Sequence, residues 1–241
     1  MLTVVTGANG HVGANLVRAL LAEGRAVRVL VHEHDEALRG LQVEVVRGDV
    51  RDPVSLQRAF AGAEVVYHLA AIISIETGSW PALEPINVVG VHNMVQAALA
   101  AHVRRLVHFS SIHALEQTPF EQPVDENNPF VNARHAPYDR SKAAGEREVR
   151  RGIEQGLNAV IIAPTGIIGP YDYQPSHAGQ MLLSLAERRM PALVNGGFDW
   201  VDVRDVVAGA MLAEQKAPAG AKYLLSGHWA SLHDVAEQVE A

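Results

Sequence analysis

The sequence predicts an α/β protein with a doubly wound parallel sheet and a small, incomplete lobe at its C-terminal end. Short apolar runs, typical of buried parallel strands, alternate with longer segments that have helical periodicity. The first apolar run ends in a glycine-rich turn that opens a helix. The chain has 241 residues, 48% of them hydrophobic, so one large domain can bury its core without a disulfide or a metal ion.

The elements before Pro164 alternate regularly between strand and helix. Leu2–Thr6 is a continuous apolar run that stops at Gly7, as a buried strand does. Asp52 followed by Pro53 is the signature of a capped helix start. Apolar runs predict strands at Leu2–Thr6, Val27–Val31, Val43–Val46, Glu64–Leu69, Leu106–Ser110 and Ala159–Ala163. Helical spacing of apolar residues predicts helices at Val12–Leu20, Pro53–Phe60, Ile86–Ala101 and Tyr138–Gln155.

The pattern is less regular elsewhere. Glu116–Pro137 contains four prolines and no periodicity, which predicts a long surface loop. After Pro164 we expect helices near 180–189 and 206–215, and strands at 200–203 and 222–225. Ser231, with Asp234 three residues later, is expected to cap a last helix. Because the chain ends soon after this cap, we expect a truncated chain and an incomplete C-terminal lobe.

Composition and charge exclude several classes of protein. The formal net charge of −7 at pH 7 argues against a general nucleic-acid-binding surface. The absence of cysteine excludes a disulfide scaffold, a thiolate zinc site and a cysteine nucleophile. No apolar run approaches the ~20 residues of a membrane span, and no basic segment precedes Leu2. We therefore expect a cytoplasmic protein that binds neither nucleic acid nor membrane.

Three glycines in the first turn, Gly7, Gly10 and Gly13, have separate tasks. Gly7 permits a tight turn, Gly10 lets the backbone approach a pyrophosphate, and Gly13 lets the helix pack closely on the strand. The N-terminus of this helix offers free N–H groups and partial positive charge to the phosphates. The motif lies in the strand–turn–helix context that a dinucleotide site requires, so we expect a dinucleotide cofactor.

The residues after the second strand leave the choice between NAD and NADP open. An acidic residue at this strand end would bind a ribose 2′-hydroxyl, and an arginine would bind a 2′-phosphate. His32 takes this position. Glu33 could bind the hydroxyl, and Arg28 or Arg39 could bind a phosphate. His32 and His34 lack a clear third ligand, so we expect no metal site.

Tyr138 and Lys142 lie four residues apart, on one face of a predicted helix. Ser110 and Ser111 follow the fifth strand, at the edge of the sheet where ligands bind. A phenol that transfers a proton near neutral pH needs its pKa lowered from ~10, and a neighbouring ammonium and an oxidised nicotinamide both favour the phenolate. These residues predict redox chemistry in which a serine hydroxyl holds the substrate oxygen.

Taken in order, these motifs resemble those of the extended short-chain dehydrogenase/reductase family, in the epimerase/dehydratase branch that includes dihydroflavonol-reductase-like proteins. The matching segments run over nearly the whole chain: Thr6–Gly13, Gly48–Val50, His68–Ala71, Asn87–Gly90, Ser110–Ser111, Tyr138–Lys142, Pro164–Pro170 and Val201–Val206. The resemblance implies a Rossmann domain over residues 1–163 that binds NAD(P). Residues 164–241 would form a mixed substrate-binding part, interleaved with the last strands of the sheet.

The resemblance also implies functional residues. Ser111, Tyr138 and Lys142 would be the catalytic trio, and Asn87 would help to order the active site. Helices of the family often build a dimer, so a homodimer is expected. The residues expected at the cofactor are Gly7, Asn9, Gly10, His11, Val12, Gly13, His32, Asp49, Val50, Leu69, Ala70, Ala71, Ser110, Tyr138, Lys142, Pro164 and Ile167.

The substrate side departs from the family pattern. Phe198 stands where nucleotide-sugar members often have an arginine, and this removes one expected contact with a diphosphate. The candidates for the substrate wall follow strand ends: His113, Tyr171, Tyr173 and His177. His113 could instead pack under the proline-rich loop, and the other three could form a polar surface loop with aromatic anchors.

Three hypotheses for the function follow. The first is an NAD(P)-dependent oxidoreductase that transfers a hydride between nicotinamide and a carbonyl or alcohol of a small molecule, with Tyr138 as acid or base. The alternative is a nucleotide-sugar epimerase or dehydratase that uses the same trio, and Phe198 argues against it. The second alternative is a non-catalytic NAD(P)-sensing protein, and the retention of both Tyr138 and Lys142 argues against that.

Overall fold

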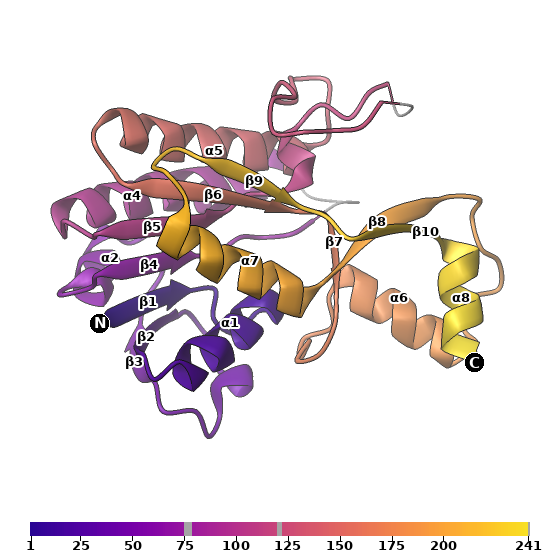
Figure 1. Cartoon of the computed structure of the whole chain (residues 1–241), viewed down its shortest axis with the longest axis horizontal. Coiled ribbons are helices and arrows are strands. Elements are labelled where there is room, and N and C mark those ends of the chain that lie inside the picture. Colours follow the sequence, from indigo (N-terminus) through magenta and orange to yellow (C-terminus); the bar gives the residue numbers. More distant parts are fainter. Residues whose placement is uncertain (75–78, 120–121, 241) are drawn as a thin grey trace.

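The computed structural model describes residues 1–74, 79–119 and 122–240. Its larger sheet has seven parallel strands in the order β3-β2-β1-β4-β5-β6-β9 (Figure 1). The strand order reverses between β1 and β4, and ligands bind at such a switch point, outside the carboxyl ends of the strands. The strands are β1 (Leu2–Thr6), β2 (Ala26–Val31), β3 (Glu44–Arg47), β4 (Val65–His68), β5 (Arg105–Phe109), β6 (Ala159–Pro164) and β9 (Lys222–Leu225).

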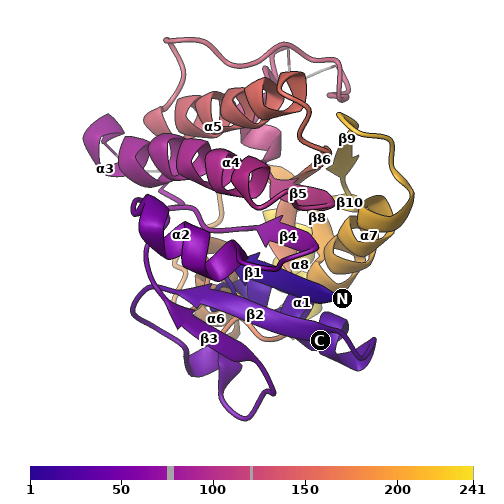
Figure 2. The same ribbon diagram turned by 90° about the vertical axis from the view of Figure 1, so that its left-hand side faces the viewer.

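Helices cover both faces of this sheet (Figure 2). One face carries α2 (Pro53–Phe60), α4 (Val91–Ala100) and α5 (Pro137–Glu154), and the other carries α1 (His11–Ala22) and α7 (Val203–Lys216). Neighbouring residues of a strand enter opposite cores, since Val66 packs on the α2 side and Tyr67 on the α1 side. The predicted doubly wound α/β fold is therefore confirmed.

A smaller lobe extends from the carboxyl edge of the large sheet (Figure 1). Its sheet has the order β10-β8-β7, with β10 antiparallel and β7 parallel to β8. Its elements are β7 (Gly166–Ile168), α6 (His177–Ala186), β8 (Gly197–Asp202), β10 (His228–Ser231) and α8 (Leu232–Glu240). The predicted cap of the last helix is confirmed, because the Asp234 N–H donates to Ser231 Oγ at 3.1 Å and the Ser231 N–H donates to Asp234 Oδ2 at 2.9 Å.

Three parts of the sequence prediction differ from the structure. The helix expected at Ile86–Ala101 begins earlier, with α3 (Trp80–Glu84) and a wider π-helical segment, η2 (Pro85–Gly90). Strands β7 and β10 are missing from the prediction because each is too short to show a period. The strand expected at 200–203 lies at 197–202, because Asp202 caps α7 by accepting from the Arg204 N–H.

An isolated antiparallel β-bridge between Leu115 and Phe130 holds the start of the loop expected at 116–137 against a later part of the same loop. Residues 120–121 of this loop lie outside the described part of the chain. In the described ranges, 1–74, 79–119 and 122–240, we find no helix with the length and apolar character needed to cross a bilayer.

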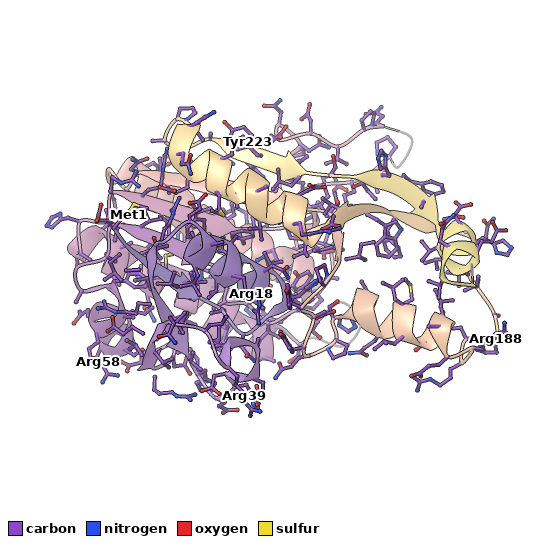
Figure 3. All side chains as sticks on the ribbon, turned by 60° about the horizontal axis from the view of Figure 1, so that its bottom comes forward. Met1, Arg18, Arg39, Arg58, Arg188 and Tyr223 are labelled. Atoms are coloured by element: carbon purple, nitrogen blue, oxygen red, sulfur yellow. The ribbon has the colours of Figure 1, made fainter. Side chains whose placement is uncertain are left out.

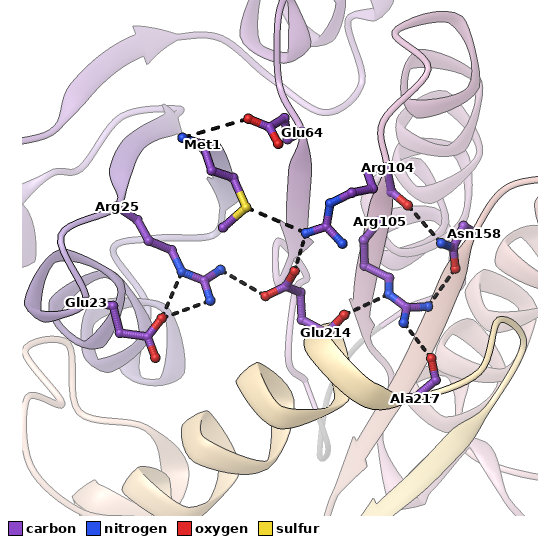
Figure 4. Close-up of polar contacts among 9 residues, drawn as sticks. All are labelled: Met1, Glu23, Arg25, Glu64, Arg104, Arg105, Asn158, Glu214 and Ala217. Atoms are coloured by element: carbon purple, nitrogen blue, oxygen red, sulfur yellow. Dashed lines mark hydrogen bonds and ion pairs between the residues drawn. The ribbon is translucent and has the colours of Figure 1, made fainter.

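The amino edge of the large sheet is closed by a charge network (Figure 4). Glu214 of α7 is buried and accepts from Arg25 at 2.9 Å and from Arg104 at 2.6 Å. Arg105 donates to the backbone carbonyls of Glu214 and Ala217. These contacts hold α7 to β5 and to the C-terminal end of α1. The amino edge of the sheet is thus occupied by stabilising contacts, and the carboxyl edge remains available to a ligand.

Candidate active site

The glycine turn lies between β1 and α1, at the switch point of the sheet. Gly7 has φ +70°, and a Cβ on it would lie 2.6 Å from the Ala70 nitrogen. A Cβ on Gly13 would overlap the Gly7 carbonyl, whereas one on Gly10 would meet no protein atom closer than 3.4 Å. No side chain caps α1, and its first turn has no acidic residue. The turn therefore leaves N–H groups and space for an anion, as a dinucleotide site requires.

Two side chains of this turn shape its surroundings. Asn9 Oδ1 accepts from the Ala37 N–H at 2.9 Å and so holds the short helix η1 (Glu36–Leu38). His11 Nε2 lies 3.1 Å from the Pro170 carbonyl oxygen, which also accepts from Asn15 Nδ2 at 2.8 Å. These contacts join the glycine turn to the segments that follow β2 and β7. Val12 lies in the first turn of α1, so direct contact of Asn9, His11 and Val12 with a cofactor stays a prediction.

The structure brings together His32 and Asp49, which the sequence places at the adenosine end. His32 Nε2 lies 3.3 Å from Asp49 Oδ2. Arg51 donates to the same carboxylate at 2.8 Å and holds the pKa of Asp49 below its usual range, with His32 acting in the same direction. Val50, the next residue, is buried under Gly90 of η2.

Arg28 does not reach this end of the sheet. Its guanidinium pairs with Glu44 at 3.0 Å and donates to the carbonyl oxygens of Ala59 and Ala61. The idea that Arg28 binds a 2′-phosphate is therefore dropped, because its donors are occupied between β2, β3 and the end of α2.

The sequence-predicted trio lies at the carboxyl end of β5, where Tyr138 hydrogen-bonds to Ser111 and Lys142 contacts Phe109. Ser111 follows β5 and accepts from the His113 N–H at 3.2 Å. The Tyr138 ring lies edge-on to the His113 ring, with centroids 5.6 Å apart. His113 Nδ1 in turn lies 3.0 Å from Asp139 Oδ1. His113 is thus beside the phenol rather than remote from it, which agrees with a substrate-side position.

Burial sets the protonation state of Tyr138. It raises the pKa of the phenol to about 12, while hydrogen bonding to the Ser111 hydroxyl acts in the opposite direction. The sequence-based expectation of a lowered pKa includes the effect of an oxidised nicotinamide and stays a prediction; in the protein itself, burial acts in the opposite direction. At neutral pH the protein therefore holds a protonated phenol, which is the form that donates a proton.

Lys142 lies one turn further along α5 and is buried. Its Nζ donates to the Phe109 carbonyl oxygen at 3.0 Å. Burial lowers the pKa of Lys142 to about 8, and the Glu146 carboxylate opposes this shift. Most of the population therefore carries a buried positive charge at pH 7.

Asn87 connects three parts of the site. Its Oδ1 accepts from the Ile72 N–H at 2.8 Å, and its Nδ2 donates to the Ile72 carbonyl and to Ser141 Oγ, both at 2.9 Å. Ser141 Oγ donates to the Tyr138 carbonyl oxygen at 2.7 Å. A Cβ on Gly145 would overlap the Asn87 carbonyl, so α5 lies directly against this residue. The geometry fits the predicted ordering role of Asn87, and the π-helical segment puts its side chain there.

Other predicted cofactor residues line the same edge. The Leu69 N–H donates to the Thr6 carbonyl at 3.2 Å, and the Ala70 N–H lies 3.3 Å from Thr6 Oγ1, so the segment Leu69–Ala71 borders the glycine turn. Pro164 ends β6, and Ile167 lies in β7. Ser110 differs from these, because its hydroxyl donates to the buried Glu146 at 2.7 Å. Sequence reasoning missed Glu146.

The predicted substrate-wall residues after β7 lie against α1. Arg18 of α1 (Figure 3) stacks on the Tyr171 ring at 4.3 Å and donates to the Tyr173 hydroxyl at 3.0 Å. Tyr171 and Tyr173 thus anchor this loop as aromatic side chains, and contact with a substrate stays a prediction for them. His177 is exposed in the first turn of α6, and its predicted substrate contact likewise stays a prediction.

A cavity of about 230 Å³ lies between the glycine turn and α6. Its wall includes His11 from α1, Ile168 from β7, and Leu182 and Leu183 from α6. The cavity is therefore bordered by His11 of the glycine turn on one side, and on the other by apolar side chains of the lobe together with the polar residues Asp172 and Ser176.

The sequence and the fold are both similar to those of known proteins. The sequence profile of the NAD dependent epimerase/dehydratase family matches residues 3–225. All of this chain aligns with 74% of sterol demethylase protein B of Methylococcus capsulatus, at 42% identity. The 2-alkyl-3-oxoalkanoate reductase of Stenotrophomonas maltophilia is 30% identical over 94% of this chain and 70% of its own length.

A solved structure shares the fold. The UDP-glucose 4-epimerase of Thermus thermophilus, in complex with NAD, matches with a TM-score of 0.86 and 26% identity. The match covers 99% of this chain and 82% of the epimerase.

Proposed function

Because the chain belongs to the NAD dependent epimerase/dehydratase family and is an NAD(P)-dependent oxidoreductase, we propose that Ser111, Tyr138 and Lys142 carry out its reaction. The reaction is the reduction of a carbonyl group of a small molecule, or its reverse. The observation that carries this proposal is the position of three side chains at the carboxyl end of β5: Tyr138 is buried and hydrogen-bonded to Ser111, and Lys142 is buried one turn further along α5, with its Nζ donating to the Phe109 carbonyl oxygen.

The residues of the glycine turn fit a dinucleotide. The uncapped start of α1 and the open side of Gly10 would hold the pyrophosphate, and the His32–Asp49 pair would lie at the adenosine. Lys142 Nζ would donate to a hydroxyl of the nicotinamide ribose. When bound, the reduced nicotinamide supplies the hydride for the substrate carbon.

The chain supplies the remaining chemistry. Ser111 Oγ donates a hydrogen bond to the substrate oxygen and orients it toward Tyr138. As the carbonyl carbon is reduced, Tyr138 Oη gives its proton to the oxygen and leaves an alcohol. The Lys142 ammonium stabilises the resulting phenolate, and the network of Asn87 and Ser141 keeps the Tyr138 backbone in place.

We propose that the substrate is largely apolar. Two similar proteins have names that refer to a sterol and to an alkylated oxoalkanoate. In this chain Phe198 is 54% exposed and packs edge-on to Trp200, at the position where a diphosphate-binding arginine is expected in nucleotide-sugar enzymes. The apolar residues of the cavity next to α6 support the same choice. Nucleotide-sugar epimerisation is therefore the weaker candidate.

A homodimer in the cytoplasm is part of this proposal. A groove formed by η2, α4 and α5 is lined by Val88, Val89 and Val95 and by the polar residues His92, Gln96, Glu148, Arg151 and Gln155. A groove of mixed apolar and polar residues on packed helices fits a second copy of the same helices. The absence of cysteine is compatible with a reducing compartment.

The experiment begins with fluorescence titration of NADH and NADPH, followed by a panel of ketones and aldehydes with the preferred cofactor. Tyr138→Phe should lower turnover by a factor of about 10²–10⁴ and leave cofactor affinity within a few-fold. Tyr223→Phe, on the exposed side of β9, is the matched control.

Three outcomes would contradict the proposal. Undiminished turnover of Tyr138→Phe would remove the phenol from the mechanism. Tightly retained cofactor with turnover but no net redox change would favour an epimerase. Cofactor binding without reduction of any compound on a broad panel would favour an NAD(P)-sensing protein.

A further inference from the structure

A layer of ionisable side chains is buried between α5 and the large sheet. The chain has three lysines, Lys142, Lys216 and Lys222, and two of them lie in this layer. Lys142 is 8% exposed, and the side chain of Lys222, from β9, is 4% exposed. Buried ammonium groups are costly unless an anion accompanies them. The layer therefore needs a negative charge.

Glu146 provides this charge. It lies one turn after Lys142 on α5 and is 0% exposed. Its Oε2 accepts from Ser110 Oγ at 2.7 Å and lies 3.0 Å from Lys222 Nζ. Its Oε1 accepts from Arg150 at 2.9 Å. Two cations and a hydroxyl, from β9, α5 and the residue that follows β5, thus surround one carboxylate.

Titratable groups face Lys142 from every element packed against it. Tyr138 and Glu146 face it from α5, His68 from β4 and His108 from β5, and Lys222 lies beyond His108 on β9. Burial lowers the pKa of His68 to about 3 and that of His108 well below its usual value, so both rings are neutral at pH 7. Among these facing groups Glu146 is the one anion.

We propose that Glu146 is a positioning residue that acts as the counterion of the buried Lys142 ammonium, and that Lys222 and Arg150 share its carboxylate. A buried carboxylate that is linked to β9, at the end of the sheet, thus stabilises the charge of Lys142. Only the catalytic meaning of this inference rests on the proposed function, because the charge state of Lys142 can be measured without cofactor or substrate.

The experiment uses the small number of lysines. Labelling with ¹³C,¹⁵N-lysine gives three side-chain Cε signals, and their chemical shifts report protonation between pH 6 and 11 by NMR. The Lys142 signal should titrate with a midpoint of about 8 in the unchanged protein. In Glu146→Gln the midpoint should fall by about one pH unit or more, because an opposite charge nearby is lost.

Glu148→Gln is the matched control on the same helix. Glu148 pairs with His92 at 3.1 Å, away from the buried layer, so this variant should leave the Lys142 midpoint unchanged. Lys222→Met is a second test that keeps the carboxylate. It removes a competing cation from Glu146, so the Lys142 midpoint should rise, and the loss of one signal assigns Lys222.

The outcomes are separable. An unchanged Lys142 midpoint in folded Glu146→Gln, or a fall of the same size in Glu148→Gln, overturns the proposal. If Glu146→Gln does not fold, Lys222→Met decides, since a rise supports the proposal and no change or a fall overturns it. NADH and NADPH titrations across the same pH range test the proposed function separately. If neither binds at any pH, that function fails, while the lysine titrations still decide the role of Glu146.

Discussion

The large sheet and the C-terminal lobe are packed in very different ways. Strands β4, β5 and β6 are buried along their whole length, whereas α6 of the lobe contains no buried residue. The proposed catalytic residues lie on α5 and directly after β5. The lobe instead presents half-exposed apolar side chains, such as Leu182 and Ile168, to the cavity beside the glycine turn.

This difference separates the two requirements of the site. Proton transfer needs groups held in fixed positions in a low-dielectric interior, and η2 and α5 provide such positions through Asn87, Ser141 and Glu146. Binding of an apolar substrate, as proposed above, needs accessible apolar surface, and the lobe has such surface. Changes in the body should therefore alter stability and chemistry together, and changes in the lobe should alter substrate affinity with little effect on stability.

The largest expected effect is acid destabilisation of the body. The pKa of His68 is lowered to about 3 from 6.5, and that of His108 is also lowered. As the pH falls, both rings therefore become protonated at a higher pH in the unfolded state than in the folded state. The contribution of the neutral rings to the free energy of unfolding is fully present above pH 6.5 and is lost as the pH drops toward 3. The loss is roughly 5 kcal/mol for His68 alone. Urea unfolding between pH 7 and 4 measures this slope.

His108→Leu should reduce that slope by one proton, about 1.4 kcal/mol per pH unit, because the variant lacks one of the two rings that bind protons more readily in the unfolded state. Within the described part of the chain the Nδ1 of His108 has no hydrogen-bond partner, so the substitution breaks no hydrogen bond at this atom. His228→Leu in β10, where the side chain is exposed, should leave the slope unchanged. Equal slopes in His108→Leu and the unchanged protein would show that the buried ring does not cause the acid sensitivity.

A matched pair of leucines tests the packing contrast directly. Leu106 in β5 is 0% exposed and Leu183 in α6 is 47% exposed. Leu106→Ala should cost about 2–5 kcal/mol of unfolding free energy, and Leu183→Ala less than about 1 kcal/mol. Leu183→Ala should instead raise KM, since Leu183 lines the cavity next to His11. Similar losses of stability in both variants would contradict the division between body and lobe.

Lys142→Met should stabilise the protein at neutral pH. The pKa of Lys142 is lowered to about 8 from 10.5, so the fold disfavours the charged form by roughly 3 kcal/mol. This penalty is complete below pH 8 and disappears as the pH rises to 10.5. The variant should gain up to that amount at pH 7 and nothing at pH 10.5. A loss of stability at pH 7 would show that Lys142 is a structural residue.

Much of the fold could be predicted from local sequence patterns. The strand at Leu2–Thr6 and the helix start at Asp52-Pro53 agree with the structure because apolar runs and caps are local signals. The π-helical segment around Asn87 could not be predicted, because it depends on packing between η2 and α5 at Gly145.

The candidate site likewise contains residues that a local sequence pattern predicts and residues that depend on contacts between distant segments. Tyr138 and Lys142 are linked by spacing on one helix, so the sequence brings them together. The partners of Glu146 come from β5 and β9 as well as α5, and pairing at such separations leaves no local pattern. The one local signal was its position four residues after Lys142. The packing of Arg18 on Tyr171 likewise joins α1 to a loop more than a hundred residues away.

The most direct measurement is the affinity of NADH and NADPH for two lysine variants, by fluorescence titration at pH 7. Lys142→Met should weaken binding of the preferred cofactor by about tenfold or more, because the ribose loses a charge-assisted hydrogen bond. Lys216→Met, which changes an exposed lysine at the end of α7, should bind as the unchanged protein does. Equal affinity in both variants would contradict a nucleotide site centred on Tyr138 and Lys142.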